Sequence, residues 1–324
     1  MSIRAAWLAE SFAAHRRFVE SLPPPLDRRF ARVAQRIACS HGGSSFETAV
    51  TAPTATPFLA LLEACRLDLG ISASDVRLSA IGEATLALYI CVRIQDDLVD
   101  EPDIFDRGYV FVAEAFAGRS LAAFAEALGT DAGFFAFHGR TMGAFALAAA
   151  WEIDVLHRGF ASPAEERRIG EKLLPMAIPL GALAFVAGRP GQAEPLRDFV
   201  VALGGDLQVV NDLLNLEDDH VGGRPSPLLA RLYREGRAAP GCSSLTLRTA
   251  LLAGEVMDEG LAWAREELDR AGKIAAALEL RHVCEVVQGR KAFLQRMPEI
   301  LVAECLRLGS SVLSSTEDSR EPIG

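Results

Sequence analysis

The chain has 324 residues, of which 50% are hydrophobic and 23% are charged, so it is long enough to bury a sizeable core. Its formal net charge of -10 argues against a nucleic-acid partner, because phosphate binding needs a basic face. The six cysteines lack the CxxC spacing of a zinc site and indicate free thiols in a reducing compartment.

The N-terminal stretch MSIRAAWLAESFAAHRRF mixes charges into an amphipathic pattern and has no apolar signal-peptide core. The longest apolar stretches carry charges, or are interrupted by glycine and proline, well short of a membrane span. We therefore expect a soluble, cytoplasmic protein without stable membrane insertion.

Helical periodicity dominates the chain, and the alternation typical of strands is almost absent. In chain order, the first predicted helices cover residues 56–69, 75–99, 120–128 and 133–159. Another helix is expected to begin at Ser162, where Ser-Pro-Ala-Glu combines an N-cap, a proline at the first position and a capping box. Pro175 and Pro179 predict a break or kink in that helix.

The next long helix is predicted over residues 196–219, followed by the loop 220–227 and by two or three more helices up to residue 297. No internal repeat and no linker rich in glycine or proline divides the chain. We therefore predict one large α-helical domain over residues 1–308. The polar tail, residues 309–324, is expected to be disordered.

The stretch IQDDLVDEPD, residues 94–103, ends the helix predicted over 75–99 and crowds five carboxylates together. On a helix, Asp96 and Asp100 share a face with Asp97 beside them, although the helix dipole disfavours anions at a C-terminus. One interpretation is a solvated acidic helix end, partly neutralised by Arg93 one turn away. The other is a site for Mg²⁺, which prefers oxygen ligands and binds substrate phosphates.

A second polar motif lies in LQVVNDLLNLEDD, residues 207–219. Asn211, Asn215 and Asp219 are spaced four residues apart and fall within about 80° of one helical face. Gln208 lies close to the same stripe, and Asp212 flanks it. The alternative is an ordinary polar stripe facing water. Two such clusters near the ends of long apolar helices favour a site where several Mg²⁺ ions bind a diphosphate.

The pair IQDDLVD and LQVVNDLLNLEDD resembles the two metal-binding motifs of the class I isoprenoid synthases. The first follows the DDxxD motif of that superfamily. The second is intermediate between FQxxDDxxD of trans-prenyl diphosphate synthases and NDxxSxxxE of terpene cyclases. The similarity spans roughly residues 52–229. It implies an all-α isoprenoid synthase fold, a large helical bundle around a central active-site cavity.

The resemblance also implies which residues bind metal and diphosphate. It implies three Mg²⁺ ions, held by seven candidate ligands: Asp96, Asp97, Asp100, Asn211, Asp212, Asn215 and Asp219. The cations that would bind the substrate diphosphate are Arg107 in Asp-Arg-Gly, Lys172 in Lys-Leu, Arg224 in Gly-Arg-Pro, and Arg168. Arg167 is an equal candidate for the diphosphate-sensing arginine, although both arginines could form a solvated helix face. Phe134, Phe135, Phe137 and Trp151 are candidate cavity walls, but ordinary helix packing explains each of them as well.

One expected cluster of cations is missing. Prenyl synthases carry GGKxxRP, which holds the diphosphate of isopentenyl diphosphate, and the matching stretch here is TAPTATP, residues 51–57. Pro53 and Thr56 occupy the two cation positions. A desolvated diphosphate needs charge-assisted contacts, so the second diphosphate site is expected to be empty.

From this pattern we predict a Mg²⁺-dependent terpene synthase, which ionises one prenyl diphosphate and cyclises the product. The first alternative is a trans-prenyltransferase that binds its acceptor without the usual basic motif. The second is a non-catalytic regulatory subunit of a prenyl synthase, although such a subunit has no physical reason to keep mutually repelling carboxylates. For the enzyme, we also consider a homodimer; the regulatory subunit would instead belong to a heterodimer.

Overall fold

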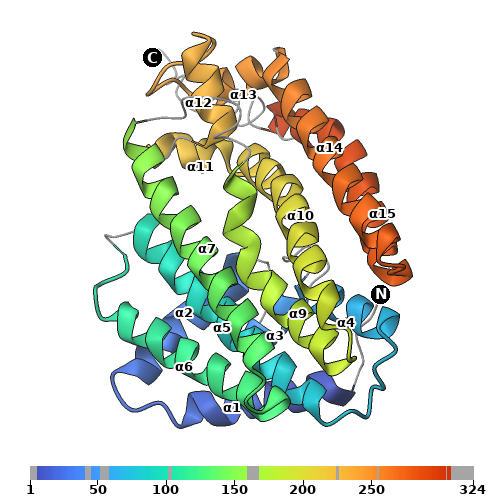
Figure 1. Cartoon of the computed structure of the whole chain (residues 1–324). Coiled ribbons are helices and arrows are strands. Elements are labelled where there is room, and N and C mark those ends of the chain that lie inside the picture. Colours follow the sequence, from blue (N-terminus) through green and yellow to red (C-terminus); the bar gives the residue numbers. More distant parts are fainter. Residues whose placement is uncertain are drawn as a thin grey trace, which may run out of the picture. The chain divides into compact units, whose positions relative to one another are not determined.

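The computed structural model describes residues 6–40, 45–51, 58–100, 104–158, 168–223, 226–253, 255–303 and 305–307. Within these ranges the chain forms helices and loops and contains no β-strand, as Figure 1 shows. The all-α fold class predicted from the sequence is confirmed. Two stretches on which predictions fell, the helix start at Ser162 and the tail 309–324, lie outside the described residues.

The chain folds into two compact units. The first comprises Met1–Leu147, Lys172–Val201 and Gly272–Val286, and the second comprises Ala148–Glu171, Ala202–Ala271 and Val287–Gly324. The single domain expected over residues 1–308 stays a prediction.

In chain order the helices are α1 Ala6–Glu20, α2 Leu26–Ser40, α3 Phe46–Thr51, α4 Phe58–Asp68, α5 Arg77–Asp100, α6 Tyr109–Leu128, α7 Ala132–Arg158, the 3₁₀ helix η1 Arg168–Met176, α9 Ala177–Val186, η2 Pro190–Gln192, α10 Ala193–Leu214, α11 Leu216–Val221, α12 Pro227–Arg234, α13 Ser244–Ala253, α14 Glu255–Ala277 and α15 Arg281–Gln295.

The two longest predicted helices agree with the structure to within two residues at the ends described. The helix predicted over 75–99 is α5, and the one predicted over 133–159 is α7. The helix predicted over 120–128 has the right end and the wrong start, because α6 begins at Tyr109. Its first half, YVFVAEAFAG, is apolar on most sides, so the helical period is weak there. The predicted break near Pro175 is confirmed: η1 gives way to α9 at Ala177.

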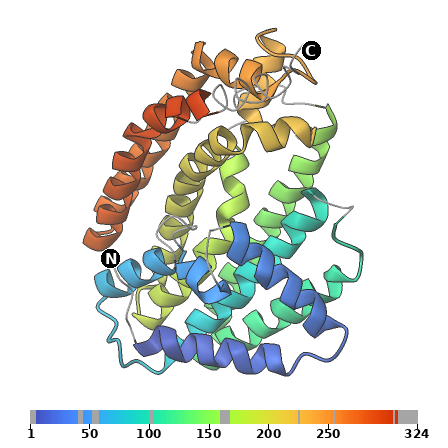
Figure 2. The same cartoon turned by 180° about the vertical axis from the view of Figure 1, so that it is seen from behind.

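Helix α5 forms the centre of the first unit. It packs against α6 on one side and against α1 on another, while α2 lies against α3 and α6 (Figure 2). Residues 81–88 of α5 are all buried, and a row of buried apolar side chains at helical spacing runs along most of the helix: Leu78, Ile81, Ala84, Ala87, Ile90 and Ile94. Because this apolar face continues to Ile94, the polar residues that follow it stand directly at the end of a core helix.

Glycine permits the close approach of α1 to α5. A Cβ atom on Gly82 would lie 2.2 Å from Ser11 Oγ and 2.8 Å from the ring of Trp7. Ser11 Oγ donates hydrogen bonds to the carbonyl oxygens of Trp7, at 2.8 Å, and Ser79, at 3.0 Å. Any larger residue at position 82 would therefore separate the two helices.

In the second unit, α10, α12, α13 and α14 enclose a separate core. Its buried residues include Val209, Leu213, Leu228, Leu251 and Leu261. The wholly buried carboxylate of Asp206 on α10 accepts a 2.8 Å hydrogen bond from Arg290 Nε on α15. Burial raises the pKa of Asp206, and Arg290 opposes that rise.

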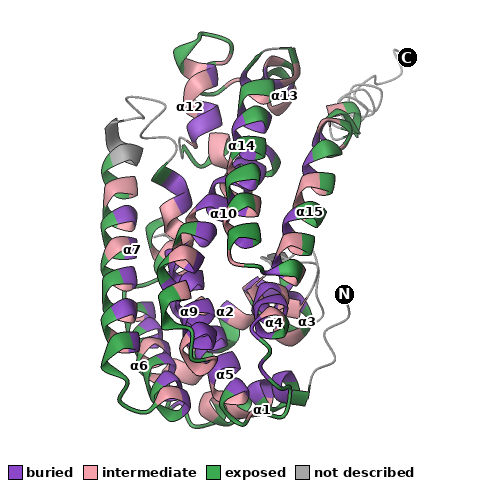
Figure 3. Cartoon of the chain, turned by 45° about the vertical axis from the view of Figure 1, so that its right-hand side comes forward, coloured by how far each residue is buried: buried purple, intermediate pink, exposed green. Residues whose placement is uncertain are grey.

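Two described helical segments, Arg77–Val99 and Arg168–Val186, are long and apolar enough to cross a membrane by length and composition alone. Of their apolar windows, 67% and 72% are buried within the protein itself. Core helices have this property as well. Along α7, by contrast, buried and exposed residues alternate with helical spacing, so one face of that helix meets solvent (Figure 3).

A buried histidine lies among aromatic rings in the first unit. The His15 ring on α1 stacks on Phe46 at 5.3 Å between centroids and contacts Phe30 and Phe116, both at 5.9 Å. Burial, and to a lesser extent the neighbouring charge of Arg16, lowers the pKa of His15 from 6.5 to about 4. The folded protein therefore holds this imidazole neutral over most of the physiological pH range.

The low pKa of His15 makes stability depend on pH. Between pH 6.5 and about pH 4, the unfolded chain binds a proton that the folded chain excludes, so the free energy of unfolding falls as the pH drops through this window. The shift corresponds to about 3 kcal/mol at most. We predict that His15→Leu removes this part of the pH dependence in urea titrations at pH 7, 6 and 5. Phe18→Leu, which alters the adjacent contact with Phe116, should lower stability without changing its slope against pH. Equal slopes in the parent and in His15→Leu would contradict the assignment.

Candidate active site

The first acidic motif occupies the last turn of α5, and its first two aspartates differ sharply in environment. The side chain of Asp97 is 2% exposed, whereas that of Asp96 is 30% exposed. The neighbours Ile94 and Leu98 pack in the core of the first unit. Adjacent carboxylates therefore point one into the protein and one toward its surface, as the 100° step of an α-helix requires.

Asp97 is neutralised by two arginines. Arg93 Nη2, one turn earlier on α5, lies 2.9 Å from Asp97 Oδ1, and Arg36 Nε on α2 lies 3.7 Å from Asp97 Oδ2. The Arg36 guanidinium also lies 5.4 Å from the centre of the Phe105 ring. A buried charge is tolerated only when it is paired in this way. Asp97 therefore links α2 to α5, and its oxygens face arginines rather than open space.

Asp96 is held by a lysine that the sequence assigned to a different role. Lys172 Nζ, in η1, donates a 3.0 Å hydrogen bond to Asp96 Oδ1, and Arg93 Nη1 lies 3.7 Å from Asp96 Oδ2. Lys172 was predicted to bind the substrate diphosphate, and Asp96 to bind metal. The structure brings these two residues into direct contact. A cation thus occupies the most accessible carboxylate that the structure describes in this motif.

The loop that follows the motif is anchored to α2. Asp106 Oδ1 accepts hydrogen bonds from the backbone N–H of Gly108, at 2.6 Å, and from Arg29 Nη2, at 3.1 Å. These contacts lower the pKa of the Asp106 carboxyl, chiefly through the Gly108 hydrogen bond. Arg107, which lies between Asp106 and Gly108 in the sequence, is exposed to solvent. Asp100 is the last residue of α5, and its side chain, together with Glu101, Asp103 and Arg224, lies outside the described residues.

The second motif does not lie on one continuous helix, as the sequence predicted. α10 ends at Leu214 and α11 begins at Leu216, with Asn215 between them at φ -98° and ψ 13°. Backbone hydrogen bonds still connect Asn215 N to Asn211 O, at 2.8 Å, and Asp219 N to Asn215 O, at 2.9 Å. The motif therefore crosses a local break that keeps much of the helical spacing.

Two side chains of the motif share an exposed face. Asn215 Nδ2 donates a 2.8 Å hydrogen bond to Asn211 Oδ1, and both residues are exposed. Asp212, in contrast, is 1% exposed and accepts a 3.0 Å hydrogen bond from Gln208 Nε2. Asp219 is partly buried on α11. In both motifs the buried carboxylate directly follows a more exposed polar residue: Asp97 follows Asp96, and Asp212 follows Asn211.

Sequence reasoning missed the residue that explains the break. Arg248 on α13 is wholly buried, and its Nη1 donates a 2.6 Å hydrogen bond to the carbonyl oxygen of Leu213. Its Nη2 lies 3.3 Å from the carbonyl oxygen of Leu214 and also pairs with Glu217 on α11. In an uninterrupted helix these carbonyls would accept from residues four positions later. The one available signal was an arginine between Leu247 and Leu251 in an otherwise apolar helix.

Other predicted site residues have ordinary packing partners. The Arg168 guanidinium lies 4.8 Å from the centre of the Trp151 ring and 3.6 Å from Glu171. Phe134 contacts Phe124, Phe135 and Phe185 within the first unit. Phe137 packs so closely on α9 that a Cβ atom on Gly181 would lie 2.3 Å from its ring. Phe134 and Phe137 are thus core residues, which leaves Phe135 and Trp151 as partly buried candidates for a cavity wall.

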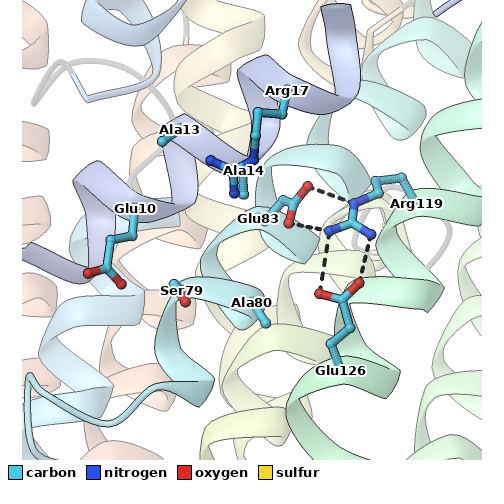
Figure 4. Close-up of a pocket in the computed structure, with 9 residues that line it drawn as sticks. All are labelled: Glu10, Ala13, Ala14, Arg17, Ser79, Ala80, Glu83, Arg119 and Glu126. Carbon is cyan, nitrogen blue, oxygen red and sulfur yellow. Dashed lines mark hydrogen bonds and ion pairs between the residues drawn. The ribbon is translucent and has the colours of Figure 1, made fainter. Parts of the chain in front are cut away.

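A groove of about 330 Å³ lies elsewhere in the first unit, between α1, α5 and α6 (Figure 4). Its charged lining consists of Glu10, Arg17, Glu83, Arg119 and Glu126. Arg119 donates to both oxygens of the buried Glu83, at 2.6 and 2.5 Å, and to Glu126 at 2.8 Å. Because Arg119 is already shared by two carboxylates and the lining holds three glutamates against two arginines, the groove is poorly suited to bind a diphosphate. It lies about 20 Å along α5 from the aspartate motif.

In the part of the chain that the structure describes, no group of three or more His, Cys, Asp or Glu side chains is close enough to hold a metal ion by itself. Among the predicted ligands whose side chains the structure describes, the accessible ones are the partly buried carboxylates of Asp96, in the first unit, and Asp219, in the second, and the exposed amides of Asn211 and Asn215. Such sparse sets suit Mg²⁺ that keeps most of its waters and binds together with substrate phosphates.

Comparison with known proteins supports the fold through solved structures and not through sequence. No protein-family model matches the chain, and no curated protein matches its sequence. Solved structures do match. The geranylgeranyl pyrophosphate synthetase of the archaeon Geoglobus acetivorans aligns with a TM-score of 0.69 and 14% identity, over 90% of this chain and 99% of the other. The polyprenyl synthase of Caulobacter crescentus, solved with calcium and isoprenyl diphosphate, aligns with a TM-score of 0.66 and 17% identity, over 90% and 98%.

A third match is the decaprenyl diphosphate synthase of Rhodobacter capsulatus, with a TM-score of 0.62, 16% identity, and 90% and 98% coverage. At these identities the similarity shows the fold. The chain has the isoprenoid synthase fold, and the resemblance inferred from its two motifs is confirmed at that level.

The contrast between Asp96 and Asp97 yields a stability test. We predict that Mg²⁺ together with pyrophosphate raises the melting temperature of the parent, that either alone does much less, and that Asp96→Asn loses the rise. Asp97→Asn should lower the melting temperature of the free protein, because it removes a buried ion pair, and should keep the rise. Differential scanning fluorimetry measures all three proteins. Equal loss of the rise in both variants would mean that Asp97 also binds metal.

Proposed function

We propose that the chain is a Mg²⁺-dependent enzyme that ionises a prenyl diphosphate and transfers the prenyl group to an acceptor. The observation that carries the proposal is the contact between Lys172 and Asp96 at the end of α5. It places a carboxylate that is accessible to metal beside a cation that suits a diphosphate, in a chain with the isoprenoid synthase fold. The resemblance of the two motifs to those of class I isoprenoid synthases implies that both bind the same diphosphate through metal ions.

Only some of the predicted ligands are placed where they could bind Mg²⁺. Asp96 is partly exposed and already binds a cation, and the side chains of Asn211 and Asn215 are exposed. Asp97 and Asp212 are buried and hydrogen-bonded, so we assign them to holding the two helix ends. Asp219 and Asp100 stay predicted ligands, and three ions stay a prediction. Bound Mg²⁺ would supply a Lewis acid that neutralises the charge developing on the departing diphosphate.

The protein itself would orient the diphosphate and supply cationic side chains that neutralise its charge. A metal ion on the Asp96 carboxylate would compete with Lys172 Nζ, which could then donate to a diphosphate oxygen. Arg93 Nη2 lies 2.9 Å from Asp97 Oδ1 and would continue to neutralise the helix end. Arg168, whose guanidinium lies over the Trp151 ring and 3.6 Å from Glu171, is the second candidate donor, and Arg107 and Arg224 stay predicted ones.

The allylic cation formed by ionisation can either be transferred to an acceptor or cyclise. The similar solved structures are named as prenyl diphosphate synthases, and this favours prenyl transfer over the terpene cyclase predicted first. Pro53 and Thr56 in place of two cations argue against an acceptor held by its own diphosphate. Prenyl transfer to an acceptor without a diphosphate satisfies both observations. Cyclisation is the second candidate, supported by the same missing cations. A homodimer and a cytoplasmic location stay predictions.

The first functional test is turnover itself. We expect pyrophosphate release from C10, C15 or C20 allylic diphosphates to require Mg²⁺ and to cease in excess EDTA. Asp96→Asn and Asn211→Ala should each lower kcat/KM by about a hundredfold or more, because several kcal/mol of charge stabilisation are lost. Glu114→Gln, an exposed carboxylate on α6, is the control and should turn over as the parent does. Undiminished release in EDTA, or no release from any of the three substrates, would overturn the proposed function.

The second test concerns the acceptor. We expect isopentenyl diphosphate neither to be elongated nor to inhibit turnover of the allylic substrate, because the two cation positions hold Pro53 and Thr56. Mass spectrometry of the products distinguishes the outcomes. A longer prenyl diphosphate would contradict this prediction and identify an ordinary chain-elongating synthase. A hydrocarbon or alcohol without any acceptor would favour cyclisation.

A further inference from the structure

Helix α11 is short, yet it is fastened at both of its ends. At its first turn, Glu217 pairs with the buried guanidinium of Arg248. At its last turn, His220 Nδ1 is hydrogen-bonded to the hydroxyl of Tyr233 on α12, and His220 Nε2 lies 2.9 Å from the carbonyl oxygen of Cys242. Asp219, a predicted ligand, lies between these two attachments. The rest of the second unit therefore fixes the direction in which α11 leaves α10.

Arg248 determines where α11 begins. It reaches the carbonyl oxygens of Leu213 and Leu214, in the last turn of α10, and the carboxylate of Glu217, in the first turn of α11. One planar guanidinium thus joins the two sides of the break at Asn215. Its rigid fork can bind acceptors in several fixed directions at once, which a lysine cannot do. Arg248 is 0% exposed, so these protein groups define its position.

The break separates the predicted ligands of the second motif. Asn211 is on α10, Asp219 is on α11, and Asn215 lies at the junction, with its side chain bonded to Asn211 Oδ1 at 2.8 Å. A change in the angle between the two helices would move Asp219 relative to the asparagine pair. Groups that hold metal ligands in place commonly change metal affinity by about tenfold or more when removed.

We propose that Arg248 is a positioning residue for the second motif: by joining the end of α10 to the start of α11, it sets the spacing of Asn211, Asn215 and Asp219 for Mg²⁺ and diphosphate. The proposal rests on the proposed function for the ligand, and on the hydrogen bonds of Arg248 for the mechanism. Arg248 itself touches neither metal nor substrate in this account.

The second unit provides a matched control. Asp206 and Arg290 form another pair of a buried carboxylate and an arginine, and Asp206 is also on α10. This pair does not contact the carbonyl groups at the end of that helix. The test variant is Arg248→Gln with Glu217→Gln, which removes both charges together, and the control variant is Asp206→Asn with Arg290→Gln. Both should lower the melting temperature, since each loses a buried ion pair.

Two readouts separate positioning from general stability. Hydrogen exchange of the ligand-free protein, measured in peptides that cover residues 211–221, should become faster in the test variant and stay unchanged in the control. The Mg²⁺ concentration that gives half of the melting-temperature rise with pyrophosphate, and half-maximal turnover, should increase about tenfold in the test variant and less than twofold in the control. Arg248→Lys, which keeps the charge and loses the fork, should give an intermediate increase and serves if the double variant does not fold.

Each outcome bears on the proposal. Equal exchange and equal Mg²⁺ requirements in the test and control variants would overturn it, because Arg248 would then act only on stability. Faster exchange with an unchanged Mg²⁺ requirement would overturn it as well, since the junction would move without affecting the ligands. If the parent shows neither turnover nor a melting-temperature rise, the proposed function fails, and that result is seen before any variant is compared.

Discussion

The structure depends on how negative charge is tolerated at the end of a buried helix. α5 carries an apolar face as far as Ile94 and then presents Asp96 and Asp97 at its C-terminal turn, where the helix dipole already disfavours anions. Arg93 contacts both carboxylates, Arg36 approaches Asp97, and Lys172 binds Asp96. Without these cations the motif would repel itself and weaken the helix that organises the first unit.

The cations are not equivalent. Those on Asp97 contact a carboxylate that is 2% exposed, and they join α2 to α5 as part of the architecture. The lysine on Asp96 contacts a carboxylate that is 30% exposed to solvent. The second motif repeats this division, with Asp212 buried and Asn211 exposed. Each motif thus combines a buried carboxylate that maintains the fold with a polar side chain that is at least partly exposed to solvent.

Much of this could be predicted from the sequence, because the signals were local. The long apolar runs gave α5 and α7 with nearly correct ends, and Pro175 marked the change from η1 to α9. The spacing of Asn211 and Asn215 correctly placed them on one face. Burial of Asp97 could not be predicted from α5 alone, since it depends on Arg36 of α2, far away in sequence. The break at Asn215 likewise depends on Arg248, and no pattern within residues 207–219 reveals that a distant arginine takes the carbonyls of Leu213 and Leu214.

The proposed function requires that Lys172, which pairs with Asp96 in the metal-free protein, would donate to the diphosphate once a metal ion binds Asp96. A crystal structure with Mn²⁺ and pyrophosphate tests this directly, because anomalous scattering locates the manganese. We expect a manganese ion on the Asp96 carboxylate, Lys172 Nζ within hydrogen-bonding distance of a diphosphate oxygen, and Arg93 still paired with Asp97. A Lys172–Asp96 pair that persists while pyrophosphate and manganese bind elsewhere would contradict it.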